Sequence, residues 1–250
     1  MKIYLAGFRT IEKTYNKPIN DVFLLSSFWE HKGGKYGDYV KQENHILDSG
    51  AFTAINNKTG KYKNFNWDNY CDKYISFIKK TKQKLFFELD IDIVVGLKKV
   101  EYYRKKIEDA IGISPIVCWH QNRGKDYWIK SCEDYNYVAL GTTQATAIGK
   151  KIRSNPSVLK WFINYAHKNN TKIHGLGFTN LHWLNRLNFD SVDSTTWLGG
   201  RFGNCFFFKN QTLNLINNKN KRVKNWYPLH IHNFEQWVKY QKYIYKFKKK

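Results

Sequence analysis

Short apolar runs recur along the chain, and each of them ends in polar residues or in glycine. We predict a strand from each of eight such runs: residues 2–7 (KIYLAG), 21–27 (DVFLLSS), 45–48 (HILD), 84–90 (KLFFELD), 115–120 (PIVCWH), 137–141 (YVALG), 172–177 (KIHGLG) and 190–194 (DSVDS). A short continuous apolar run is typical of a strand that is buried on both faces, as in a parallel sheet.

Apolar residues with helical spacing lie between several of these runs. Three stretches show this pattern and are predicted to be helices: residues 67–82, 98–111 and 157–169. In the first of them, Tyr70 and Tyr74 stand four residues apart and so share one side of the helix. Asn155 before a proline predicts the start of the third helix, and Thr179-Asn180 predicts a cap ahead of a helix over residues 181–187.

This alternation of strands and helices decides the expected fold class. About eight strand–helix repeats in 250 residues predict an α/β fold, a (β/α)₈ TIM-like barrel that spans residues 1–250 as a single domain. A doubly wound open sheet is the alternative. We interpret the polar, basic residues 210–225 as a loop and the Lys- and aromatic-rich residues 233–250 as a C-terminal helix. That helix either closes the barrel or contacts nucleic acid with its lysines.

The net charge of the chain indicates what kind of partner it binds. The chain has 42 Lys and Arg residues against 20 Asp and Glu residues, a formal charge of +22. Such an excess predicts a polyanionic partner, most simply nucleic acid, although abundant Lys and Asn also reflect an AT-rich genome. No apolar run reaches 18 residues and no signal peptide is apparent, so we expect a cytoplasmic protein, in the host cytoplasm if phage-encoded. The four cysteines are too far apart in sequence for a zinc-type pair and are expected to be reduced thiols.

Polar residues gather where the predicted strands end. In a parallel barrel these carboxyl ends form the active face. The residues found there are Asp48, Ser49, Asp90, Asp92, Gln121, Gly141, His174 and Asp193. Each one alone is explained as a turn, a cap or a core residue. Their occurrence at equivalent ends of successive strands predicts a site that holds a flat base and keeps two acids for chemistry.

Five motifs follow one another in the order seen in tRNA-guanine transglycosylases. They are LDSGAF (47–52), ELDID (88–92), HQ (120–121), ALG (139–141) and VDSTTWLGGR (192–201). The chain most resembles the short, zinc-free relatives that insert 7-deazaguanine bases into phage or bacterial DNA. It departs from the family pattern at Ala51 and Thr53, and it lacks the CxCxxC…H zinc motif of the tRNA enzymes, which puts a tRNA substrate in doubt.

The resemblance implies a role for each matched position. Asp193 would be the nucleophile that attacks C1′ of the sugar, and Asp48 the general acid/base for the departing and incoming bases. Ser49, Asp90 or Asp92, Gln121, Gly141 and His174 would bind the base edge, and Phe52 would stack on its face. Arg201 and the basic-loop residues Lys219, Lys221 and Arg222 would contact the nucleic acid. The chemistry requires no metal or other cofactor, and the partners would be DNA with a flipped or single-stranded guanine and a free 7-deazaguanine base.

We therefore expect a DNA guanine transglycosylase that exchanges guanine for a 7-deazaguanine (preQ0-like) base through a covalent aspartate–sugar intermediate. Three alternatives stay open from the sequence: a tRNA-guanine transglycosylase, a nucleosidase that hydrolyses instead of exchanging, and a non-catalytic nucleic-acid-binding barrel.

Overall fold

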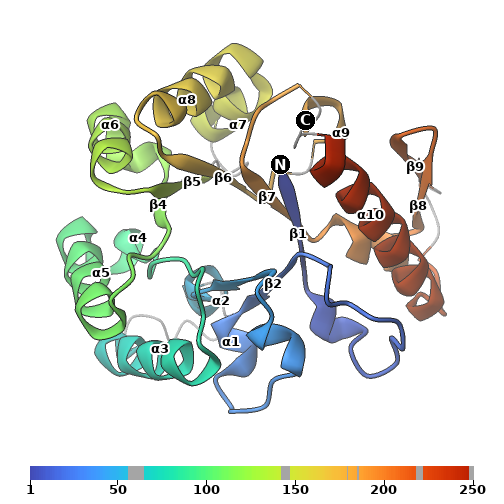
Figure 1. The fold of residues 1–250 in the computed structure, drawn as a ribbon, viewed down its shortest axis with the longest axis horizontal. Helices are drawn as coiled ribbons and strands as arrows, with labels where there is room; N and C mark the ends of the chain where they lie inside the picture. The colour runs from blue at the N-terminus through green and yellow to red at the C-terminus, as the bar shows by residue number, and fades with distance from the viewer. Residues whose placement is uncertain (56–64, 142–146, 179, 185, 218–221, 248–250) are drawn as a thin grey trace.

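Apolar strand segments at regular intervals build the main sheet. The computed structural model describes residues 1–55, 65–141, 147–178, 180–184, 186–217 and 222–247. Seven parallel strands pair in the order β3-β2-β1-β7-β6-β5-β4. Their bounds are β1 Lys2–Ala6, β2 Leu24–Ser27, β3 His45–Asp48, β4 Val117–Trp119, β5 Tyr137–Gly141, β6 Lys172–Leu176 and β7 Ser191–Ser194. The sheet curls into a half-barrel with the helices on its outer side, consistent with a TIM-like α/β fold (Figure 1).

The run predicted as a strand over residues 84–90 is the main departure from the expected eight strands. It makes only isolated parallel bridges, from Phe86 to Leu47 of β3 and from Phe87 to Ile116 just before β4. The Phe87 N–H donates to Leu47 O at 3.0 Å, and the Ile116 N–H donates to Phe86 O at 2.8 Å. This segment therefore lies between the two outermost strands without being a regular strand itself.

The helices are α1 Phe28–His31, α2 Ala51–Ile55, α3 Trp67–Thr81, α4 Asp92–Val95, α5 Leu97–Ile111, α6 Gly124–Asp134, α7 Ala147–Ser154, α8 Pro156–Lys168, α9 Leu181–Leu184 and α10 Tyr227–Phe247. Helices α3, α5 and α8 follow the predicted bounds closely, whereas α1, α2, α4, α6 and α7 were not predicted. The Asn155 side chain caps α8 by accepting from Ser157 N–H at 3.0 Å, as predicted. Asn180 accepts from His182 N–H at 3.1 Å, while Thr179 lies outside the described residues. Helix α9 ends at Leu184, so the prediction of a helix to residue 187 was too long.

The prediction of a basic loop over residues 210–225 was wrong for the first half of that segment. Strand β9 Thr212–Asn217 lies in this half and forms an antiparallel hairpin with the preceding strand β8 Asn204–Lys209. Asn210 and Gln211 both have positive φ, which is what a tight two-residue hairpin turn requires. Leu213 packs as a buried residue opposite Phe208, so the period-two pattern of a strand was present but obscured by the many Asn residues.

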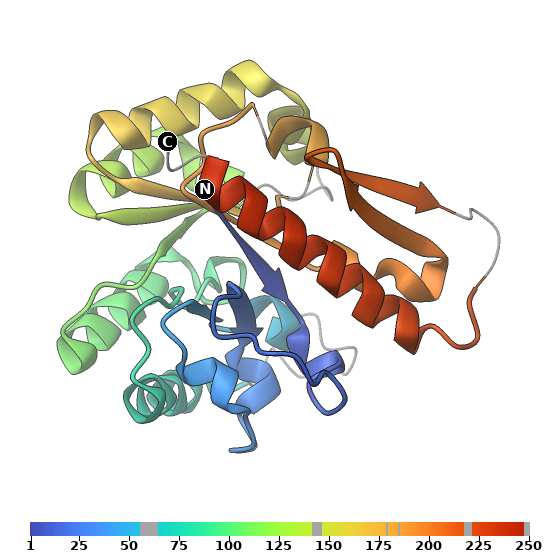
Figure 2. The ribbon, with the colours of Figure 1, turned by 45° about the vertical axis from the view of Figure 1, so that its right-hand side comes forward.

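The C-terminal helix begins earlier than residue 233 and closes the structure. Helix α10 starts at Tyr227, where Pro228 is tolerated in the first turn, and residues 248–250 lie outside the described chain. It crosses beside β1 and the β8–β9 hairpin (Figure 2). Its buried Gln241 donates to Ile3 O at 2.6 Å and to Phe23 O at 2.9 Å. The helix therefore packs against β1, while its predicted roles in closing a barrel and in contacting nucleic acid stay predictions.

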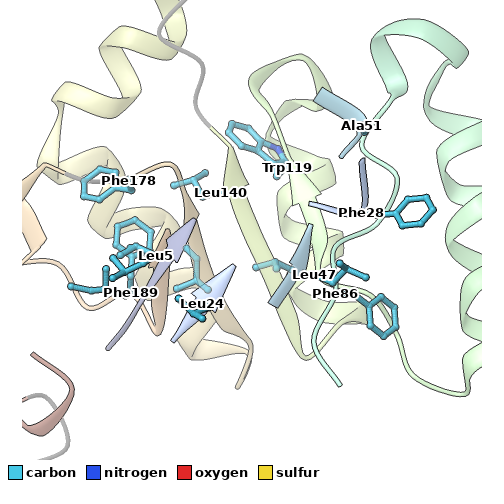
Figure 3. Close-up of a cluster of buried hydrophobic side chains, with 14 of the residues drawn as sticks. Leu5, Leu24, Phe28, Leu47, Ala51, Phe86, Trp119, Leu140, Phe178 and Phe189 are labelled. Atoms are coloured by element: carbon cyan, nitrogen blue, oxygen red, sulfur yellow. The ribbon is translucent and has the colours of Figure 1, made fainter. Parts of the chain in front are cut away.

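Alternating side chains give the sheet two separate apolar layers. In β1, Ile3 and Leu5 belong to the large layer between sheet and helices, whereas Tyr4 and Ala6 belong to a smaller layer inside the curl. Figure 3 shows the outer layer, to which several strands and helices contribute. Burial on both faces explains why the strand segments read as continuous apolar runs. It also means that polar side chains at the strand ends emerge above the inner layer.

Candidate active site

A cavity of about 620 Å³ opens above the inner apolar layer, at the carboxyl ends of the strands. Six of the predicted site residues line it: Asp48, Ser49, Phe52, Asp90, Gly141 and Asp193. They come from β3, α2, β5, β7 and the segment after residue 88, which the curl of the sheet brings to one place. Phe52 lines the cavity with 78% of its surface exposed.

Asp48 ends β3 and is the most strongly perturbed carboxyl group of the cavity. Its Oδ2 accepts a hydrogen bond from the Gly50 N–H at 3.0 Å. Burial raises the pKa of Asp48 from 3.8 to about 7, and the negative charges of Asp193, Asp90 and Glu30 add to the rise. A carboxyl with this pKa both donates and accepts protons near neutral pH, as a general acid/base must.

Gly50 allows the sharp turn between Asp48 and α2. Its φ is 75°, and a Cβ at this position would lie 2.6 Å from Ser27 Oγ and 2.7 Å from Trp29 Cβ. We expect Gly50→Ala to lower the free energy of unfolding by about 2–4 kcal/mol, measured by denaturant titration. Gly34→Ala is the control, because Gly34 has a φ of 81° but no atom near its missing Cβ, so only about 1 kcal/mol is expected. Equal losses in the two variants would show that the contacts around Gly50 do not matter.

The Asp193 side chain is held by contacts with β6 and with the residue that follows this strand. Strand β7 pairs with β6, and the Oδ1 atom of Asp193 accepts from Gly177 N–H at 2.6 Å and lies 3.1 Å from His174 Nε2. Both contacts go to the same oxygen. Asp193 lines the cavity, and among the described residues no group hydrogen-bonds its Oδ2.

Asp90 and Asp92 were alternatives for the base-reading carboxylate, and the structure separates them. Asp90 lines the cavity, where its Oδ1 accepts from Arg123 at 2.8 Å and its Oδ2 contacts His120. Asp92 begins α4 and accepts from Asn122 at 2.7 Å and Arg123 at 3.3 Å, away from the cavity wall. Although burial acts to raise it, the pKa of Asp92 is lowered by the charge and hydrogen bonds of Arg123. The prediction of Asp92 as a base-binding residue is therefore not supported by its position.

His120 occupies the place that the sequence analysis gave to Gln121. Gln121 begins the 3₁₀ helix η4 Gln121–Arg123 and lines a different depression, beside Trp161 between α6 and α8. His120 lines the main cavity, and its ring fills the space next to Gly141, where a Cβ would lie 2.3 Å from Cε1. Burial acts to lower the pKa of His120, but the hydrogen bond to Asp90 raises it overall. The glycine therefore makes room for this ring.

His174 was predicted to contact the base, but the structure places it outside the lining of the cavity. The side chain has no exposed surface and packs inside the curl, with Phe87 at a ring-centroid distance of 5.2 Å. It reaches Asp193 and not the cavity. A residue in the middle of a strand points to either face of the sheet. The sequence therefore did not indicate that His174 contacts Asp193, another candidate site residue.

Two carboxylates of the site were not identified from sequence. Glu30 in α1 lines the cavity, and burial raises its pKa. Glu88 has no exposed surface; it accepts from Cys118 N–H at 2.9 Å and pairs with Arg104 and Arg123, each at 2.7 Å. The only signal for Glu88 was its place in ELDID. Its partners are sixteen or more residues away in sequence, so no local pattern indicated the pairing.

Two of the four residues predicted to contact nucleic acid lie in the part of the chain that the structure describes. Arg201 lies exposed in the 3₁₀ helix η5 Thr196–Phe202, whose Leu198 lines the cavity. Arg222 is exposed too, and the Val223 N–H beside it donates to Arg201 O at 3.3 Å, so these two cations lie on adjacent segments. Lys219 and Lys221 lie outside the described residues.

The described part of the chain has neither a metal-binding cluster nor a membrane-spanning helix. There, no cluster of three or more His, Cys, Asp or Glu side chains is arranged to hold a metal ion. Within the same residues, no helix combines the length and the apolar character needed to cross a bilayer. The four cysteines are free thiols, three of them buried.

Comparisons of the chain with protein-family models, with curated proteins and with solved structures found no match.

Proposed function

We propose that this chain is a DNA guanine transglycosylase, which replaces guanine in DNA by a free 7-deazaguanine base. The observation that carries the proposal is the pair of carboxyl groups that line one cavity: Asp48 with a pKa raised to about 7, and Asp193 with both of its hydrogen-bond contacts on Oδ1. Two carboxyl groups in different environments are what an exchange at C1′ needs.

The exchange divides into two half-reactions, as in retaining glycosidases. In the first, Asp193 Oδ2 bonds to C1′ while the C1′–N9 bond breaks, and the departing guanine takes its proton from Asp48. In the second, N9 of the incoming base bonds to C1′, its proton passes to Asp48, and the bonding electrons return to Asp193. Asp48 thus donates and accepts one proton in each cycle, which suits a pKa near the working pH.

The remaining cavity residues suit a purine. Phe52 offers an exposed ring for stacking, and Ser49 and Asp90 offer hydrogen-bonding groups at one side. His120, paired with Asp90, adds a second polar group at the cavity wall. A (β/α)₈ barrel is part of the same proposal, with residues 85–88 as a short eighth element between β3 and β4; their backbone hydrogen bonds to both neighbours support it.

DNA is preferred over tRNA because the chain lacks the zinc-binding motif that accompanies tRNA action in the similar family. The charge of +22 suits either polymer. The target guanine must be flipped or single-stranded, since C1′ is shielded by stacking in a duplex.

A labelled-guanine assay tests the proposal. Purified protein is incubated with radiolabelled guanine and, separately, duplex DNA, single-stranded DNA and bulk tRNA, and the label retained in each polymer is counted. We expect label in DNA. Label in tRNA alone would favour the tRNA enzyme, and release of guanine without incorporation would favour a nucleosidase. If the protein binds DNA but neither incorporates label nor releases guanine, it would be a non-catalytic binding protein.

Salt dependence tests the phosphate contact proposed for Arg201. Because each neutralised phosphate releases counterions, Arg201→Ala is expected to reduce the slope of log affinity against log salt by about 1. Binding of a labelled single-stranded oligonucleotide between low and moderate salt measures the slope. Lys105→Ala is the control, because Lys105 is a surface cation on α5 already paired with Asp109 at 2.6 Å. An unchanged slope in Arg201→Ala would remove this residue from the DNA interface.

A further inference from the structure

Four polar side chains form a continuous hydrogen-bonded chain that ends on Asp193. Ser191 and Asp193 are two residues apart on β7 and point to the same inner face. His174 Nε2 lies 3.1 Å from Asp193 Oδ1, and His174 Nδ1 lies 2.5 Å from Ser191 Oγ. The Tyr137 hydroxyl, at the start of β5, lies 2.6 Å from Ser191 Oγ. Three neighbouring strands therefore contribute to one chain.

The partners assign the protons along this chain. A carboxylate only accepts, so His174 donates its Nε2–H to Asp193. With neutral imidazole, Nδ1 then accepts, and the Ser191 hydroxyl donates to it. The Ser191 oxygen in turn accepts from the Tyr137 hydroxyl. Every donor in the chain consequently points toward Asp193.

The surroundings suit a fixed relay and not a ligand contact. His174 is fully buried and packs near the rings of Phe87 and Tyr4 at 5.2 and 6.3 Å. Burial raises the pKa of Tyr137, so it remains a phenol and a hydrogen-bond donor at neutral pH. A buried network in which each member has its partner holds its end group in one orientation.

We propose that His174, Ser191 and Tyr137 form a positioning relay that orients the Asp193 carboxylate and stabilises the negative charge returning to it when the sugar leaves. This inference rests on the proposed function. In the covalent intermediate Asp193 is an uncharged ester at C1′, and in the second half-reaction the C1′–Oδ2 bond breaks with its electrons going to the carboxylate. Donors on Oδ1, from His174 and from the Gly177 backbone, make that carboxylate a better leaving group.

The relay predicts a specific kinetic signature. Tyr137→Phe removes one oxygen and keeps the ring, and it is expected to lower kcat by about threefold to tenfold and the KM for DNA with it, because kcat/KM for DNA is set by the first half-reaction. His174→Leu removes the donor itself and is expected to lower kcat by about a hundredfold. Breakdown of the glycosyl-enzyme is the step that slows, so the fraction of enzyme covalently bound to DNA at steady state should rise in both variants. A purely structural defect would lower that fraction instead.

Tyr4→Phe is the matched control. Tyr4 is buried in the same inner layer beside His174, and no hydrogen bond joins it to the relay residues. We expect its kcat and covalent fraction to equal those of the wild type. Should His174→Leu fail to fold, Tyr137→Phe still decides the question. A wild-type kcat and covalent fraction in Tyr137→Phe would overturn the relay.

A second readout does not depend on activity. Nitrogen-15 NMR of histidine-labelled protein at neutral pH should show His174 protonated at Nε2 and unprotonated at Nδ1, with the signal assigned by its loss in His174→Leu. Protonation at Nδ1 alone would overturn the relay even in an active enzyme. If the wild type neither exchanges guanine nor forms a covalent complex, the proposed function fails, and the catalytic role of the relay fails with it, whatever the tautomer.

Discussion

Asp193→Asn is expected to lower guanine exchange by about 10⁴-fold or more, because it removes the oxygen that bonds to C1′. The substituted side chain has nearly the same shape, and its carbonyl oxygen still accepts from the Gly177 N–H, so folding should be retained. Initial rates of labelled-guanine incorporation into DNA measure the loss. No covalent protein–DNA complex should form in this variant.

Asp92→Asn is the control for that result. Asp92 is a carboxylate close to the site in sequence, but Arg123 and Asn122 hold it away from the cavity. We expect its exchange rate to stay within a few-fold of the wild type. Should Asp193→Asn retain near-normal exchange, Asp193 would not be the nucleophile, and a comparable loss in Asp92→Asn would restore Asp92 to the base-binding site.

Asp48→Asn is expected to change activity and stability in opposite directions. Exchange should fall by about 10³-fold, because no group then protonates the departing guanine. In the wild type, exchange should be fastest near pH 7, since Asp48 must be protonated in the first half-reaction and ionised in the second. The bell-shaped dependence on pH should be lost in the variant.

The stability change follows from the same pKa. Because the folded protein holds the Asp48 proton more tightly than the unfolded chain, wild-type stability falls as pH rises from about 4 to about 7. A shift from 3.8 to about 7 corresponds to about 4 kcal/mol at most. Asp48→Asn should therefore be more stable than wild type by about 2–4 kcal/mol at pH 8 and show no such gain below pH 4.

Urea unfolding of both proteins across this range measures the difference. Glu43→Gln serves as a control, because Glu43 is an exposed carboxylate paired with Lys84 and should leave the pH dependence above pH 5 unchanged. A wild type and an Asp48→Asn variant whose stabilities stay parallel from pH 4 to pH 8 would show that Asp48 titrates as an ordinary surface carboxyl group.

Much of the fold was readable from the sequence because its signals are local. Seven of the eight apolar runs contain strands, and helices α3, α5 and α8 lie within two residues of their predicted bounds. Strand β9 was missed because its alternating Asn residues look like a loop, and β8 was not predicted. Residues 84–90 have the composition of a strand, yet only isolated bridges form there, and composition does not report how regularly a segment pairs.

The site was predictable to the extent that strand ends converge in a parallel sheet. Asp48, Ser49, Phe52, Asp90, Gly141 and Asp193 share the cavity as expected. The prediction named Gln121 where the structure places His120. The two residues are adjacent in sequence after the end of β4, where the chain enters η4. Buried pairs such as Glu88 with Arg104 and His174 with Ser191 arise from packing between distant segments, which no local pattern encodes.

The most direct test of the central claim is the identity of the covalent intermediate. Wild-type protein is incubated with a guanine-containing single-stranded DNA oligonucleotide and no acceptor base, denatured, digested and analysed by mass spectrometry. We predict a peptide containing Asp193 that carries the oligonucleotide at a site from which guanine has been lost. Incorporation of labelled guanine without any adduct, or an adduct on another residue, would contradict the account.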